Sequence, residues 1–305
     1  MEKRFSFFED QSATNIVVEQ PVHTPVNETQ EVNKIRYRCE QLNATRIEDR
    51  IISHASTKKE YLVEKQPASN KANVTLVDYF YEIEPARLSI ALDAMKEMEF
   101  IKETAEFRLN GDNEIEEVLN LTQMADKWNE HRMKLMGTEF YKEIESRAPK
   151  AAQDILNAGD LEFKNQQNIK LSYDRVMLYH LLFNNYADIN KVQVLKFLSQ
   201  IFVNIPVEVV LTNKIKSQNN DTITVHTHGE LVKEKLKIGD IEAQYDLYYK
   251  PAVKYAFTDY IYEYYIIRTI DKTSGNIIEA NALLTEGVKN NYSTSTDCSL
   301  KQVRL

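Results

Sequence analysis

Two histidines, His226 and His228, come closest to the spacing of a metal site. Alternate side chains of a β-strand point to the same side, so both imidazoles would face one way, as two ligands of a single ion must. Protein zinc sites use at least three side-chain ligands, and the sequence names no third ligand for this pair. We therefore predict no metal and no cofactor, and we interpret the two residues as exposed or hydrogen-bonded histidines.

The remaining candidate residues lack the partners that catalysis requires. His131 and His180 stand outside any Glu-x-x-His or His-Glu-x-x-His run, the helical spacings typical of metal ligands. Cys39 and Cys298 form no Cys-x-x-Cys pair; they fall in expected strands near opposite ends of the chain, could be neighbours, and are expected to be free buried thiols. The chain also has no Gly-x-Ser-x-Gly elbow and no Gly-x-Gly-x-x-Gly run. We predict that it is not an enzyme.

A helical block at residues 121–204 is expected to position the rest of the chain. Apolar residues recur three, four or seven positions apart from Leu121 onward, which predicts a helix that ends near Arg147. Pro149 is acceptable in the first turn of a second helix, which Gly159 would end. Short polar residues predict two further helix starts, at Ser172 and Asn190.

Strands are expected on both sides of this block. Ile35, Tyr37 and Cys39 follow a period of two, which is typical of a strand with one buried face. Similar patterns in the first flank predict strands at 34–40, 46–54, 60–65 and 74–83, a helix after Pro85 and a hairpin at 104–120. The second flank returns to strands at Pro206, and its last part predicts a three-stranded meander at 260–271, 277–286 and 292–304.

Together these elements predict an α+β fold, in which antiparallel β-sheets from the N- and C-terminal flanks pack against a central helical layer of three to four helices. With 305 residues and 43% hydrophobic content, the chain can bury a sizeable core. It divides into four regions: an extended N-terminal arm (1–33), a β-rich region with one amphipathic helix (34–120), the helical block (121–204) and an antiparallel β meander (205–305). The sequence leaves open whether the two flanks form one sheet or two domains.

Charge and hydropathy argue against several functional classes. The formal net charge is -8, and residues 78–120 contain 12 acidic and 4 basic residues. An acidic surface repels phosphate backbones, so nucleic-acid binding is not expected. No apolar stretch has the length of a membrane span and no secretory signal opens the chain, so we predict no membrane span and a cytoplasmic location.

Two features favour contacts with other proteins. The arm contains an apolar run, Ile16, Val17 and Val18. One side of an expected strand carries a row of tyrosines, Tyr260, Tyr262 and Tyr264. Tyrosine offers a large contact area at low entropic cost, although strand propensity explains the row equally well. We predict a structural or protein-interaction subunit of a larger assembly, which contacts other subunits or copies of itself through the arm and the tyrosine-rich sheet.

Three other hypotheses use the same features differently. A curved sheet under a helical lid could bind a small molecule or a lipid in a wide apolar cavity. An acidic face at 78–120 could serve an inhibitor or immunity-type protein that blocks a basic enzyme cleft. A metal-dependent enzyme would use His226 and His228 and would bind stoichiometric metal.

Overall fold

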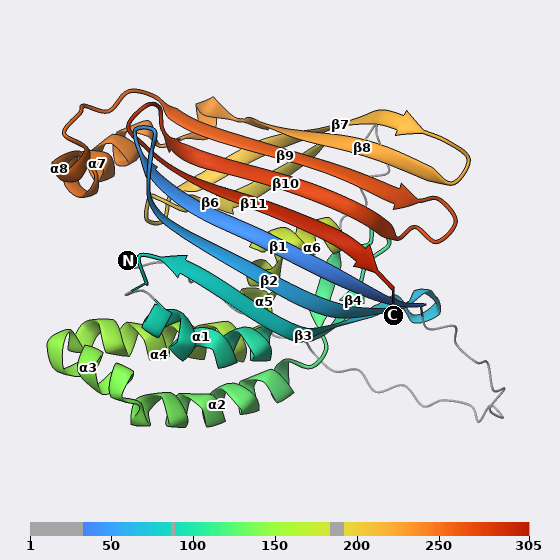
Figure 1. The fold of residues 1–305 in the computed structure, drawn as a ribbon, viewed down its shortest axis with the longest axis horizontal. Coiled ribbons are helices and arrows are strands. Elements are labelled where there is room, and N and C mark those ends of the chain that lie inside the picture. The colour runs from blue at the N-terminus through green and yellow to red at the C-terminus, as the bar shows by residue number, and fades with distance from the viewer. Residues whose placement is uncertain (1–32, 87–88, 184–191, 305) are drawn as a thin grey trace, which may run out of the picture.

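The first β flank forms a meander of five antiparallel strands (Figure 1). The fold comes from a computed structural model of the chain, which describes residues 33–86, 89–183 and 192–304. In chain order the strands are β1 (Asn33–Ile47), β2 (Arg50–Gln66), β3 (Lys71–Glu84), β4 (Thr104–Leu109) and β5 (Ile115–Val118). The hairpin expected at 104–120 is confirmed, because β4 pairs with β5. The strand expected at 46–54 is wrong: Glu48, with a positive φ of 52°, lies in the reversal between β1 and β2.

The second flank forms a meander of six strands. They are β6 (Gln193–Leu198), β7 (Pro206–Gln218), β8 (Thr222–Leu231), β9 (Tyr260–Asp271), β10 (Ile277–Val288) and β11 (Tyr292–Val303). The helix expected after Asn190 is wrong, because Val194, Leu195 and Leu198 belong to the edge strand β6. Phe197 faces the core while Val194 and Lys196 are exposed, a period of two that pairing with β7 stabilises.

The two meanders join into one sheet at the first and last strands. β1 pairs with β11 from Arg36↔Val303 to Ile47↔Tyr292, so the strand order is β5-β4-β3-β2-β1-β11-β10-β9-β8-β7-β6. The chain therefore has a single antiparallel sheet of 11 strands, where the sequence left one or two open. We call the β1–β11 pairing the seam. Stability across the middle of the sheet depends on it, since the two halves share no other strand pair among the described residues.

The helices divide into groups instead of forming one uniform layer. They are α1 (Ser89–Lys102), α2 (Leu121–Gly137), α3 (Glu139–Arg147), α4 (Pro149–Lys164), α5 (Gln166–Arg175), α6 (Met177–Phe183), α7 (Ile238–Tyr248) and α8 (Lys250–Val253). All seven residues of α6 are buried, and this helix contacts β10 and β11. The helices α2, α3 and α4 pack mainly on one another and on α1, beside β3 (Figure 1). The expected central helical layer is thus not confirmed as a single layer.

Two residues show where the helix boundaries differ from those expected. The helix expected from Leu121 to near Arg147 is split at Thr138, whose side chain accepts a hydrogen bond from the Tyr141 backbone and caps α3. Gly159 was expected to end a helix but lies inside α4. A Cβ atom there would come within 2.2 Å of the Trp128 ring, so this glycine allows the buried indole to pack against α4.

The sheet has two different faces. The inner face carries the side chains that pack with the helices in one large core, for example Val63, Phe107, Leu211 and Tyr264. The outer face carries the alternate residues, and no helix of the described ranges covers it (Figure 1). None of the described helices combines the length and the apolar character needed to cross a membrane.

Candidate functional site

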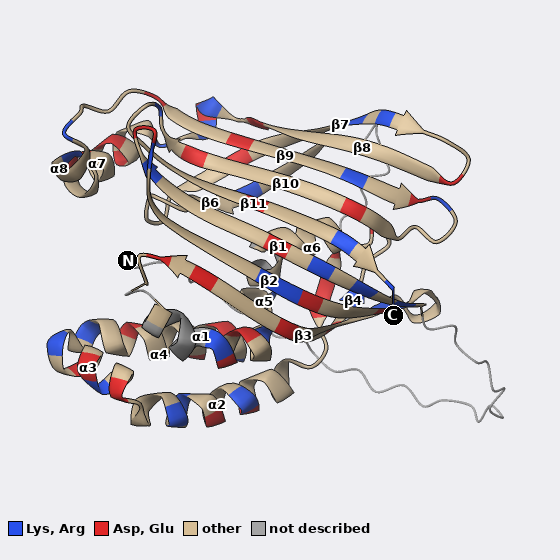
Figure 2. Ribbon diagram, viewed as in Figure 1, with Lys and Arg blue, Asp and Glu red and all other residues tan. Residues whose placement is uncertain are grey.

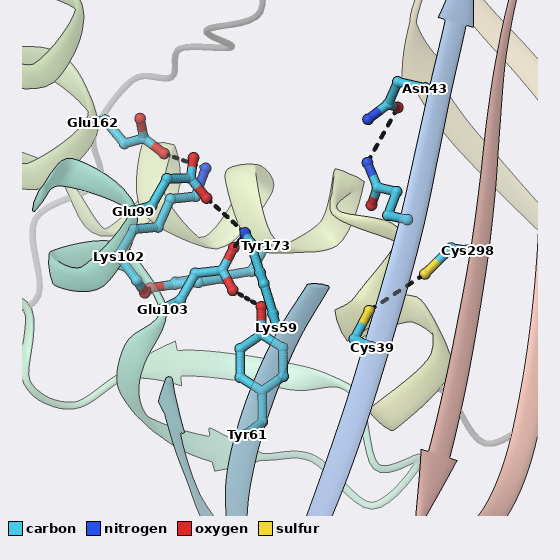
Figure 3. Close-up of polar contacts among 11 residues, drawn as sticks. Cys39, Asn43, Lys59, Tyr61, Glu99, Lys102, Glu103, Glu162, Tyr173 and Cys298 are labelled. Carbon is cyan, nitrogen blue, oxygen red and sulfur yellow. Dashed lines mark hydrogen bonds and ion pairs between the residues drawn. The ribbon is translucent and has the colours of Figure 1, made fainter. Parts of the chain in front are cut away.

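The densest set of chemically active side chains lies under the inner face, between β2 and α1 (Figure 3). Lys59 of β2 contacts the carboxylates of Glu99 and Glu103 at 2.8 and 2.7 Å. These two acids stand one helical turn apart, so they face the same way. Tyr61, two residues after Lys59 on the same side of β2, donates its hydroxyl proton to Glu103. We call these four residues the Lys59 cluster.

A second ion pair continues the network into α4 and α5. Lys102 contacts Glu162 at 2.9 Å, and the Ser172 hydroxyl donates to the same carboxylate at 2.5 Å. Tyr173 donates its hydroxyl proton to the backbone carbonyl of Lys102. Charged or polar groups of β2, α4 and α5 therefore hold the C-terminal end of α1 in place (Figure 3).

The Lys59 cluster keeps its groups in unreactive states. Burial alone would lower the pKa of Lys59, but the carboxylates of Glu103 and Glu99 outweigh it and raise that pKa. Burial alone would raise the pKa of Glu99, yet the ammonium groups of Lys59 and Lys102 lower it. Burial raises the pKa of Tyr173. A nucleophilic lysine or tyrosine needs a lowered pKa, so these directions favour a structural role.

The two cysteines lie beside this cluster, across the seam. Cys39 of β1 and Cys298 of β11 place their sulfur atoms 3.6 Å apart, and both are buried free thiols, as the sequence analysis expected. The hydrogen bond with Cys298, followed by burial, raises the pKa of the Cys39 thiol. Next to them Asn43 accepts hydrogen bonds from Gln41 and Thr296. The resting Cys39 thiol is therefore protonated and poorly nucleophilic.

A separate buried carboxylate, Glu286 of β10, holds the chain that follows β6. It accepts hydrogen bonds from the Tyr260 hydroxyl at 2.8 Å, from the Gln200 backbone at 2.6 Å and from the Ser199 hydroxyl. Burial raises the pKa of Glu286, and the hydrogen bonds offset part of that rise. This residue fixes one loop against the core.

The predicted tyrosine row lies in the core. Tyr260, Tyr262 and Tyr264 face inward and are 2%, 7% and 0% exposed. Phe197 of β6 packs against the rings of Tyr262 and Tyr264. These three side chains are therefore out of reach of a partner on the folded surface. The other predicted contact residues, Ile16, Val17 and Val18, lie outside the described residues.

The histidine pair lies on the outer face. His226 and His228 alternate on β8 as expected, and the ring of His228 stacks on Tyr265 with centroids 4.7 Å apart. The Nδ1 atom of His228 lies 3.8 Å from Glu230. Among the described residues no group of three or more His, Cys, Asp or Glu side chains could hold a metal ion. The stack favours a packing role for His228.

An apolar row on this outer face was not predicted from the sequence. Its members are half-exposed side chains on strands β1, β9 and β10, namely Leu42 (43%), Tyr265 (44%), Ile267 (37%) and Leu283 (37%). Leu283 pairs directly with Tyr265 of β9 and with Asp297 of β11, and Asp297 in turn pairs with Leu42 of β1. We call these four residues the outer row. The sequence did contain a signal for it: Tyr265 and Ile267 alternate with the inward-facing residues of the same strand, which places them on its opposite face.

The Lys59 cluster was missed as well. The spacing of Glu99 and Glu103 is visible in the sequence, but Lys59 lies 40 and 44 residues before them. These acids belong to the stretch 78–120 that carries the excess of negative charge. Glu99 and Glu103 are paired inside the molecule, so they do not add to a surface charge, while exposed carboxylates remain on β3, at Asp78, Glu82 and Glu84 (Figure 2).

Two hollows bear on the small-molecule hypothesis. One is lined by residues of β2, β3 and the start of α1, including His54, Tyr81 and Glu84. The other is lined by residues at the end of α4, including Asp160, Leu161 and Lys164. Both open broadly at the surface, so neither is the enclosed cavity that a buried lipid site would need.

Comparison with known proteins adds no function to these sites. The sequence matches no protein-family model, and it finds no match among curated proteins. The proposals below therefore rest on geometry and chemistry.

Proposed function

We propose that this protein is a non-enzymatic interaction subunit, which binds another protein or a second copy of itself through the outer face of its sheet. The observation that carries this proposal is the outer row. It places the half-exposed side chains of Tyr265, Ile267 and Leu283 on the adjacent strands β9 and β10, and that of Leu42 on β1, across the exposed Asp297 of β11. Contiguous apolar patches on a protein surface mark interaction sites more often than scattered single residues do.

The surroundings of the outer row fit a protein interface. Tyr265 presents a rigid aromatic ring, which suits a contact anchor because few rotatable bonds are ordered on binding. Charged side chains flank the row toward β2, where Arg36 and Arg38 both pair with Glu60. An apolar centre with a polar rim is the usual anatomy of an interface.

The buried groups support the non-enzymatic part of the proposal. The cluster at Lys59 keeps its lysine charged, and the raised pKa of Cys39 keeps its thiol protonated. An enzyme that used either residue as a nucleophile would need the opposite shift. The N-terminal arm, with Ile16 to Val18, remains the second proposed contact.

Solution mass provides the test. We expect light scattering after size-exclusion chromatography to give the full chain a mass above the 35.5 kDa of one copy, or to show a co-eluting partner. The double variant Tyr265→Asp/Leu283→Asp should lose that association, because burying a carboxylate in an apolar interface is unfavourable. A version lacking residues 1–32 tests the arm separately.

A matched control separates the row from general surface hydrophobicity. Leu247 of α7 is 65% exposed and lies outside the row, so Leu247→Asp should leave the association unchanged. The proposal fails if the full chain is a lone monomer that captures no protein. It also fails if the double variant associates as well as the full chain does.

A further inference from the structure

We infer that Cys39 and Cys298 are a modification site, at which a small disulfide oxidant converts the two thiols into an intramolecular disulfide that cross-links β1 and β11 at the seam. The two residues are 259 positions apart in the chain, yet their sulfur atoms lie 3.6 Å from each other. They are also the only two cysteines of the sequence, so no other intramolecular pairing competes.

The backbone places the pair on neighbouring strands with both side chains turned inward. Cys39 pairs with Leu300 and Cys298 pairs with Gln41, so the cysteines are diagonal neighbours two residues out of register. A disulfide bond is about 2.05 Å long, and the sulfurs must therefore approach by roughly 1.5 Å. Figure 3 shows them pointing at each other across β1 and β11. Side-chain rotation with a small shift of the strands can supply that movement.

The reaction balances with a low-molecular-weight disulfide as the oxidant. One protein thiolate attacks the small disulfide, forming a mixed disulfide and releasing one small thiol. The second protein thiolate then attacks the protein sulfur of that mixed disulfide and releases the second small thiol. The two protein thiols lose two electrons and two protons, and the small disulfide gains both.

Burial controls the rate of this reaction. Cys39 is 5% exposed and Cys298 is 0% exposed, so the oxidant reaches them only when the seam opens locally. The hydrogen bond between the thiols opposes ionisation of Cys39, which slows the attack further. Slow oxidation of the native protein, accelerated by mild denaturant, is therefore the expected signature.

The structural effect follows from the position of the seam. The disulfide would close a loop that contains most of the chain, and long loops gain the most from a cross-link in the chain-entropy view. It would also tie together the only strand pair that joins the two meanders among the described residues. Oxidation should therefore raise Tm by about 5 to 10 °C.

The test incubates the full chain with oxidised glutathione, with and without mild denaturant, and then blocks remaining thiols by alkylation. Intact mass should show a monomer lighter by about 2 Da and resistant to alkylation, and a non-reducing digest should link the peptides of Cys39 and Cys298. The Tm of the oxidised protein should exceed that of the reduced protein. Reduction should reverse both changes.

Single variants provide the control. Cys39→Ser and Cys298→Ser should each keep one alkylatable or glutathione-capped thiol and gain no Tm on oxidation. Mixed glutathione adducts or disulfide-linked dimers of the original chain, in place of the internal bond, would overturn the inference. So would an internal bond that lowers Tm, because the sulfur geometry would then be incompatible with the native seam. The mass measurement needs no variant, so it stands even if a serine variant folds poorly.

Discussion

The two faces of the sheet use the same residue types for different purposes. Tyr264 and Tyr265 are consecutive in β9, yet Tyr264 is 0% exposed in the core while Tyr265 is 44% exposed in the outer row. Lysine shows the same contrast: Lys59 is 13% exposed and pairs with the buried Glu103, whereas Lys34 is 53% exposed and pairs with Glu64. Side-chain direction, more than residue type, therefore decides whether a residue stabilises the fold or remains available to a partner.

The largest expected effect separates the two tyrosines. Tyr264→Ala should lower the free energy of unfolding by about 3 to 5 kcal/mol, because it removes a fully buried ring. Tyr265→Ala should cost no more than about 1 kcal/mol, as expected for a half-exposed side chain. Urea unfolding of both variants measures the difference. Equal costs would mean that the outer face is covered in the folded protein, and the contrast drawn between the two faces would be wrong.

The next prediction compares buried and exposed ion pairs. Lys59→Met leaves Glu99 and Glu103 without their cation, and breaking a buried pair in this way should cost about 3 kcal/mol. Lys34→Met removes an exposed pair and should cost between about 0 and 1 kcal/mol. Thermal unfolding at one pH compares the two.

A second substitution checks the cause of the larger effect. If an unpaired carboxylate is responsible, adding Glu103→Gln to Lys59→Met should recover part of the lost stability. A double variant that is less stable than the single one by the full cost of Glu103→Gln would show no coupling. The role given to the Lys59 cluster would then be wrong.

Local alternation could be predicted from the sequence, and long-range pairing could not. Period-two patterns placed the strands around Tyr37 and the C-terminal meander correctly, because they reflect which face is buried. The residues after Asn190 were wrongly predicted as a helix, because an apolar run of that length fits a strand or a helix equally well. Pairing with β7, which is not visible in the local sequence, makes it a strand. The Lys59 cluster depends on how α1 docks, and no local pattern encodes that. The cysteine contact was foreseen only as a possibility, because it depends on the seam.

The buried carboxylate of Glu286 should make the stability of the fold depend on pH. Because burial raises the pKa of Glu286 in the folded protein, its contribution to stability is complete below the unfolded value of about 4.3 and is lost as the pH rises through the folded pKa. The free energy of unfolding of the original chain should therefore fall relative to that of Glu286→Gln as the pH rises from 4. Glu279→Gln, on the exposed side of β10, serves as the matched control. A pH-independent difference for Glu286→Gln would contradict the raised pKa.

The smallest expected effect concerns the stack of His228 on Tyr265. Cross-strand pairs of this kind contribute about 0.2 to 1 kcal/mol, so His228→Ala should lower the free energy of unfolding by no more than that. A double-mutant cycle with Tyr265→Ala isolates the pair from the other contacts of each ring. The control is His226→Ala, because His226 lies on β8 like His228 but pairs with Ile267 of β9. A coupling well above 1 kcal/mol would make the outer face a structural element of the fold. A small coupling means that these side chains can exchange their present contacts for those of a partner at little cost to the sheet.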